Sequence, residues 1–206
     1  MVVPTIAQLV DALPDAALSG LLAFAFGAVL KVSDLLQEHG YRWFRGADIA
    51  MGALSTALLL GVLHRADDVH RVFWLAVLLH WVLRGRIDGL NHGLVVTASL
   101  LALALWEPSL LERNLAPFLY FFIPLTALGL LHDLYQYTAL PGPPWLKEFF
   151  KNQHLYWYLI IVGHPVVTAF DLALAVAGLS FVKGYGVFYS ERACAMLPRV
   201  GIAPPT

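Results

Sequence analysis

Long apolar runs constrain this chain more than any other feature of its sequence. An α-helix needs about 20 apolar residues to cross the roughly 30 Å hydrocarbon core of a bilayer. Six segments approach that length, and we predict helices at 16–34, 47–64, 70–84, 87–106, 115–134 and 155–182. Sustained strand alternation is missing from the sequence, which therefore predicts a single-domain, all-α integral membrane bundle with about six transmembrane helices.

The composition favours the same class. Hydrophobic residues make up 59% of the 206 positions and charged residues only 13%, about half of the charged share in a typical soluble domain. A formal net charge of −1 gives no electrostatic reason to expect nucleic acid as a partner, so membrane lipids are the expected surroundings. The only cysteine, Cys194, excludes an internal disulfide.

Three other segments carry specific expectations. After the PGPP sequence at 141–144, aromatic residues share a segment with lysines and a glutamate, which predicts a short interfacial helix near 145–152. The predicted helix 155–182 is longer than one perpendicular crossing needs, and tilt or a bend at Pro165 would absorb the excess. Residues 183–206 are polar enough to leave the membrane as a C-terminal tail.

Acidic residues recur where the odd-numbered connections leave the apolar runs. In a six-helix chain, the first, third and fifth connections emerge on one face of the membrane. Asp34, Asp88 and Asp133 stand at these ends, each beside a long apolar run where a carboxylate is costly. Each also has a histidine nearby, at 33–40, 87–93 and 132–137, which suggests three pseudo-repeated helical hairpins.

This set of side chains predicts a divalent-metal site that binds phosphate. Carboxylates and imidazoles are metal ligands, and the oxygen-rich share favours Mg²⁺ or Mn²⁺ over Zn²⁺. Arginine binds phosphate through a forked pair of hydrogen bonds. The candidate catalytic residues are Asp34, Asp88, Asp133, His92 and His132; the candidate metal ligands are Asp34, Glu38, His39, Asp88 and Asp133; and the candidate substrate-binding residues are Lys31, Arg84, Arg86, Asn91 and Gln136.

The expected function is that of a membrane enzyme that hydrolyses or transfers the phosphoryl or diphosphate group of a lipid or isoprenoid. The metal would polarise the phosphorus oxygens while a carboxylate or histidine activates water or an acceptor hydroxyl. A plainer interpretation is that charges at helix ends anchor the chain at the head groups, with Lys31 and Asp34 as an intrahelical ion pair. Anchoring does not require repeated Asp and His, so we keep the enzyme as the leading hypothesis.

Asp171 suggests a second hypothesis. It falls inside the predicted helix 155–182, seven residues after His164, and a carboxylate at that depth normally faces the bundle interior or a wet cavity. The two residues would then form an ion or proton relay in a transporter or channel. A noncatalytic subunit of a membrane complex is the third hypothesis, and the oligomeric state stays open. His64 and His70 look like parts of a solvated loop and are assigned no role.

The distribution of Lys and Arg between the two faces hardly favours either membrane orientation. Of the 13 Lys and Arg residues, seven belong to the odd-numbered connections and six to the opposite face. The absence of basic residues near the N-terminus favours a cytoplasmic location for the candidate site.

Overall fold

The computed structural model describes residues 5–87, 89–137, 142–151, 153–189 and 195–204. This described part is all-α. Three helices in it are long and apolar enough to cross a membrane: α1 (Ile6–Gln37), α2 (Ala47–Arg65) and, over Leu115–Tyr135, α6 (Leu115–Tyr137). The chain therefore has the helices of a membrane protein, although shorter apolar helices make up the rest of the bundle.

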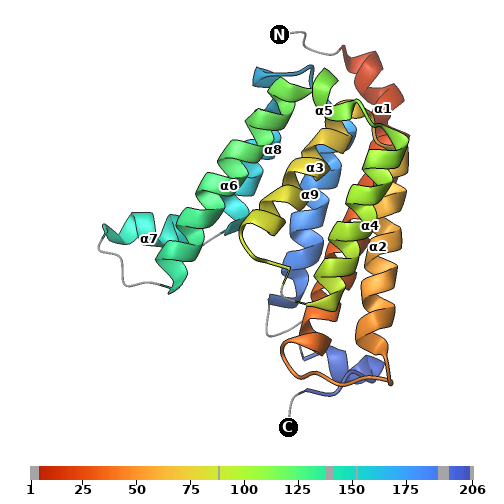
Figure 1. The fold of residues 1–206 in the computed structure, drawn as a ribbon, viewed down its shortest axis with the longest axis vertical. Coiled ribbons are helices and arrows are strands. Elements are labelled where there is room, and N and C mark those ends of the chain that lie inside the picture. The colour runs from red at the N-terminus through yellow and green to blue at the C-terminus, as the bar shows by residue number, and fades with distance from the viewer. Residues whose placement is uncertain (1–4, 88, 138–141, 152, 190–194, 205–206) are drawn as a thin grey trace.

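The remaining elements pack around these three helices or connect them. The other helices of the bundle are α3 (Asp68–Leu83), α4 (Leu90–Trp106), α8 (Gln153–Gly163) and α9 (Leu172–Gly186), with the short helices α5 (Leu110–Arg113) and α7 (Pro144–Lys151) between them. Consecutive bundle helices run in alternating directions (Figure 1). α1 packs most closely against α9 and α2, α2 also packs against α4, and α3 packs mainly against α6.

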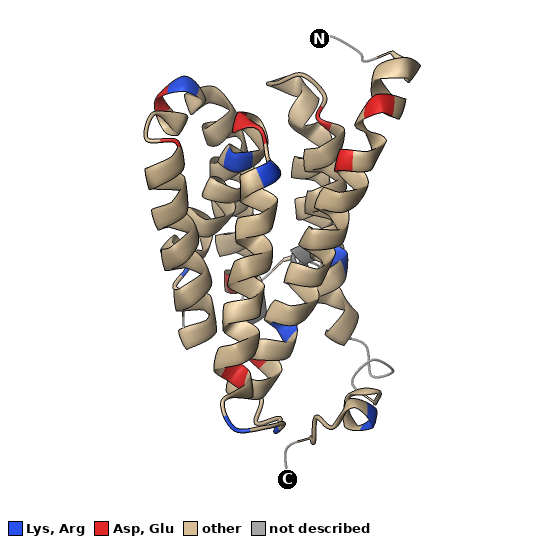
Figure 2. Cartoon of the chain, turned by 90° about the vertical axis from the view of Figure 1, so that its right-hand side faces the viewer, with Lys and Arg blue, Asp and Glu red and all other residues tan. Residues whose placement is uncertain are grey.

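The bundle has two ends, and charged residues gather near both (Figure 2). The connections α1–α2, α3–α4 and α6–α8 lie toward one end together with the C-terminus, and we call this the odd end (Figure 1). The connections α2–α3, α4–α6 and α8–α9 lie at the other, the even end. Figure 2 shows most charged residues near these two ends, with the middle of the helices largely uncharged. Loops predicted to share one face therefore do lie toward one end of the molecule.

The predicted helix 155–182 is two helices in the structure. α8 ends at Gly163, a 3-10 turn covers His164–Val166, and α9 begins at Leu172 and runs back toward the odd end. Pro165 stands in that turn, where its missing N–H breaks no helical ladder. Asp171 caps α9, because its carboxylate accepts a hydrogen bond from the Leu174 N–H at 3.1 Å. The chain reverses here, so the prediction of one tilted or bent helix was wrong.

The segment predicted as a polar tail returns to the bundle. Its first residues, up to Gly186, complete α9. Farther along, Leu197 and Ile202 are buried against Leu35 at the end of α1. An isolated antiparallel bridge joins Ala203 to Arg42 in the α1–α2 connection. The described part of the C-terminal segment therefore closes the odd end.

α7 lies where the short interfacial helix was predicted. It spans Pro144–Lys151 and stands out from the side of the bundle near the end of α6 (Figure 1). Its predicted position on a membrane surface stays a prediction.

Aromatic rings form the centre of the core. Trp74 of α3 packs edge-on against Phe26 of α1 and Phe181 of α9, with ring centroids 5.8 and 5.4 Å apart. Phe26 and Phe181 stack on each other at 5.1 Å. Such contacts add a specific geometry to the burial of large apolar rings. They fix the three helices side by side, and two of these helices carry the candidate site.

Candidate functional site

Two carboxylates and one imidazole meet at the odd end. Asp34 and Glu38 lie one turn apart at the end of α1, and His92 lies in the first turn of α4. One ligand atom from each residue falls within 4.8 Å of the other two. His92 Nε2 is 3.5 Å from Asp34 Oδ1, and His92 Nδ1 is 3.9 Å from Glu38 Oε1. We call these residues the trio, and their donor atoms could hold a divalent metal ion.

The ends of α1 and α4 set the position of the trio. α4 begins after its N-cap Gly89, which places Asn91 and His92 in the first turn, close to the end of α1. The Asn91 side chain donates to Asp34 Oδ1 at 2.8 Å, and its backbone N–H donates to Gln37 Oε1 at 3.3 Å. These two hydrogen bonds hold the start of α4 against the last turn of α1.

α9 closes the site from the other side. The Tyr185 hydroxyl donates to Asp34 Oδ2 at 2.8 Å, and Lys31 Nζ lies 3.7 Å from the same oxygen. Lys31 also lies over the Tyr185 ring, 5.2 Å from its centroid. Asp34 is only 1% exposed, so these donors and the lysine charge are what make a buried carboxylate tolerable there. Glu38, in contrast, is exposed and gives the trio an open side.

Asp133 belongs to a different cluster. It lies on α6 and accepts hydrogen bonds from Arg84 Nε at 2.8 Å and Nη2 at 2.6 Å, and from Arg86. Arg84 Nη1 also lies 3.0 Å from Nε2 of His80, a buried histidine one turn earlier on α3. The arginines predicted to bind phosphate are therefore paired with a carboxylate. His80 was not among the predicted residues, although its i, i+4 spacing from Arg84 was visible.

Arg84→Ala should destabilise the fold much more than Arg86→Ala. Arg84 is 5% exposed and makes a forked pair with Asp133, and breaking a buried pair from one side typically costs about 3 kcal/mol. Arg86 is 35% exposed, so we expect a loss of about 1 kcal/mol or less. Denaturant unfolding of both variants in detergent would measure the difference, and equal losses would contradict this interpretation of the cluster.

Two other predicted residues, His39 and His132, lie outside the trio, and two more fall beyond what the structure describes. His39 is exposed beyond the end of α1, and His132 is buried on α6. Asp88 and the side chain of Gln136 lie outside the described residues. Among the described residues, the odd end therefore holds two groups of contacts, the trio and the Asp133 cluster.

His164 and Asp171 lie at the even end, away from the predicted site. His164 is fully buried, and its Nε2 accepts a hydrogen bond from the Asp171 N–H at 2.9 Å. Its Nδ1 lies 2.6 Å from the Ile161 carbonyl oxygen, to which a proton on Nδ1 would donate. Both nitrogens thus hold the α8–α9 reversal together. The use of His164 and Asp171 as an ion or proton relay stays a prediction. The two residues belong to different elements and do not share a helix face.

Chemical inference about this protein rests on these contacts. A comparison with protein-family models, curated proteins and solved structures finds no match. The trio combines two carboxylate oxygen donors with one imidazole nitrogen donor. Glu38 is exposed, whereas Asp34 and His92 are buried. Such a set can hold a divalent cation at the end of the bundle while leaving one side accessible.

Proposed function

We propose that this protein is a membrane enzyme that uses a divalent metal to act on the phosphorylated head group of a lipid or isoprenoid. The observation that carries the proposal is the convergence of Asp34, Glu38 and His92 within 4.8 Å. From the sequence alone, the number of carboxylates at the candidate site favours Mg²⁺ or Mn²⁺ as the bound ion. Because imidazole prefers transition metals, we now propose Mn²⁺ first and Zn²⁺ second.

Charge supports an anionic substrate. Lys31 pairs with Asp34, and Glu38 adds a second carboxylate, so without a metal this group has one net negative formal charge. A bound divalent cation would reverse it to one net positive charge. A phosphate group is then attracted to the occupied site and repelled from the empty one, which couples substrate binding to metal binding.

The position of the trio supports an amphiphilic substrate. It lies where α1, a helix long and apolar enough to cross a membrane, ends. A head group bound there would leave its hydrocarbon tail alongside the apolar helices. We propose multiple membrane crossings, with the odd end on the cytoplasmic side.

In the proposed hydrolysis, a water oxygen attacks phosphorus. The bond from that phosphorus to the oxygen of the lipid alcohol, or to the bridging oxygen of a diphosphate, breaks. The metal would polarise the phosphoryl oxygens and offset the charge that develops on them. A carboxylate oxygen of the trio would accept the proton that the attacking water loses and return it to the oxygen of the leaving group. Glu38 is best suited to that step because it is the exposed member.

Phosphate release tests this proposal. The purified protein in nanodiscs would be mixed with Mn²⁺ and, in turn, phosphatidic acid, farnesyl phosphate and farnesyl diphosphate. We expect release from at least one of them, lost with a chelator and reduced by about 100-fold or more in Glu38→Gln, the usual size of a general-base effect. Glu112→Gln changes an exposed glutamate on α5 at the even end and should keep full activity. Release from no substrate, or equal release in Glu38→Gln, would refute the proposal.

A further inference from the structure

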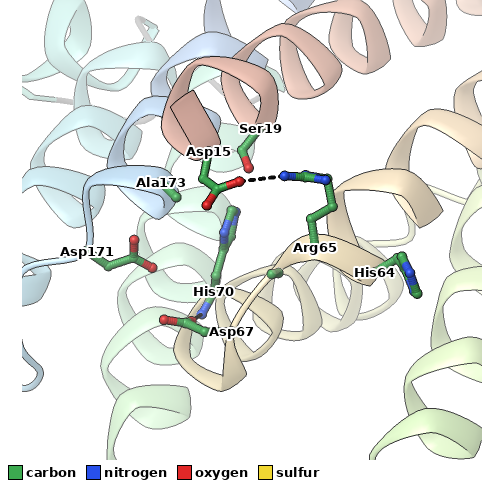
Figure 3. Close-up of a pocket in the computed structure, with 9 residues that line it drawn as sticks. Asp15, Ser19, His64, Arg65, Asp67, His70, Asp171 and Ala173 are labelled. Carbon is green, nitrogen blue, oxygen red and sulfur yellow. Dashed lines mark hydrogen bonds and ion pairs between the residues drawn. The ribbon is translucent and has the colours of Figure 1, made fainter. Parts of the chain in front are cut away.

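A cavity of about 400 Å³ opens at the even end. α1, α2, α3 and the start of α9 surround it, and Asp15, Arg65, Asp67, His70 and Asp171 are among its lining residues (Figure 3). The sequence does not predict this cavity, because its pattern places His70 in a solvated loop and Asp171 inside a helix. The chain reversal between α8 and α9 is what brings Asp171 to this place.

Two polar atoms in this cavity lack the partner that burial normally requires. His70 is 1% exposed, and its Nε2 has no hydrogen-bond partner among the described residues. Asp171 uses Oδ1 to cap α9, but its buried Oδ2 has no such partner either. Figure 3 shows both side chains directed into the space below Asp15. Buried polar atoms are nearly always paired, so these two atoms mark a place for a hydrogen-bonding ligand.

The charge of the lining indicates a cation. Asp15, Asp67 and Asp171 face a single arginine, Arg65, which is already paired with Asp15. With neutral histidines, the lining has an excess of two negative formal charges. Among the described residues, the only ligand atoms close enough together for one metal ion are those of the trio. No three carboxylate or imidazole ligand atoms of the described cavity lining lie within 4.8 Å of one another, so the lining favours a cation that needs fewer acceptors and carries N–H donors.

We propose that the even-end cavity binds a primary ammonium group, whose N–H bonds donate to His70 Nε2 and Asp171 Oδ2. Three donors on one nitrogen match the separate acceptors, and the surrounding carboxylates balance its charge. The ammonium group would come either from a free small amine or from the ethanolamine head group of a membrane lipid. This binding activity is independent of the metal-dependent reaction proposed for the odd end.

The affinity should rise with pH. Burial raises the pKa of the Asp171 carboxyl above its usual range, and the nearby charge of Asp67 raises it further. An ammonium ion prefers the ionised carboxylate, so binding strengthens as Asp171 loses its proton and weakens as pH falls through the raised pKa. The other groups that face this space are Asp15, Arg65, His64, His70 and His164.

The test uses two sources of the same group. In the first arm, ethanolamine is titrated into the protein in phosphatidylcholine nanodiscs and followed by calorimetry and by the melting temperature. In the second arm, phosphatidylethanolamine replaces part of the phosphatidylcholine. Stabilisation in the first arm alone assigns the site to a free amine, and stabilisation in the second assigns it to the lipid. Choline, which has no N–H donor, should bind at least about 10-fold more weakly than ethanolamine.

Asp171→Asn separates a binding role from a structural one. Asparagine keeps the oxygen that caps α9 but removes the buried charge, so the ligand-free melting temperature should stay equal or rise. Amine binding should weaken by about 10-fold or more, the loss expected when a charged acceptor is removed. Asp68→Asn, at the same end but paired with Arg113 outside the cavity lining, should keep the affinity. No stabilisation of the unaltered protein in either arm would overturn the proposal, whatever the variants do.

Discussion

His92→Ala is expected to lower the affinity for Mn²⁺ by about 100-fold or more. Its imidazole is the nitrogen donor of the trio and lies 3.5 Å from Asp34 Oδ1 and 3.9 Å from Glu38 Oε1. Replacing groups that merely support a metal ligand already costs 10- to 100-fold in affinity, so loss of a ligand should cost at least the upper value. Electron paramagnetic resonance of free Mn²⁺ during a titration of the purified protein would measure the change.

The matched control for this prediction is His39→Ala. His39 follows Glu38 directly and was a predicted ligand, but it is exposed and lies outside the trio. Its removal should leave Mn²⁺ affinity unchanged. A loss in His39→Ala together with normal binding in His92→Ala would show that the wrong histidine has been assigned.

Gly184→Ala should destabilise the whole bundle by about 3 kcal/mol, the upper range for overpacking. α9 approaches α1 so closely at this residue that an added Cβ would clash with the Phe24 carbonyl oxygen. Because the obstacle is backbone, α1 and α9 would have to separate. That movement would also pull Tyr185 from Asp34 and weaken metal binding. Denaturant unfolding in detergent would measure the loss.

Gly61→Ala is the corresponding control in α2. Here the nearest atom to an added Cβ is Leu22 Cδ1, at an ordinary 3.7 Å. Alanine inside a helix loses less backbone entropy than glycine, so this variant should be more stable by about 0.5 to 1 kcal/mol. The two substitutions are chemically identical, but we expect them to change the free energy of unfolding in opposite directions. A small effect of Gly184→Ala would mean that the α1–α9 contact is looser than described.

Continuous apolar runs predicted helices well but did not reveal where the chain turns. The segments 47–64 and 115–134 match α2 and much of α6, because each run is bounded by polar or charged residues. The run 155–182 stays apolar across the reversal, so its hydropathy hides the turn. Gly163 and Pro165 were signals of a break, and Asp171 had the character of an N-cap, but it was interpreted as an intramembrane carboxylate.

The candidate site was predictable only one helix at a time. Periodicity showed that Asp34 and Glu38 lie near one another on α1, and α4 brings His92 to them. Periodicity within a helix does not reveal which helices are neighbours, so Asp133 was expected beside Asp34 but pairs with Arg84 and Arg86, which follow α3. Tyr185 was missed because it fell in the predicted tail, and only the return of α9 toward the odd end brings it to Asp34.

Anomalous diffraction from crystals grown with Mn²⁺ tests the central claim most directly. We predict an anomalous peak bounded by Asp34, Glu38 and His92, at coordination distance from one atom of each, and its loss in crystals of His92→Ala. A map with no peak between these residues at saturating Mn²⁺, or with its peak at the Asp133 cluster, would contradict the account.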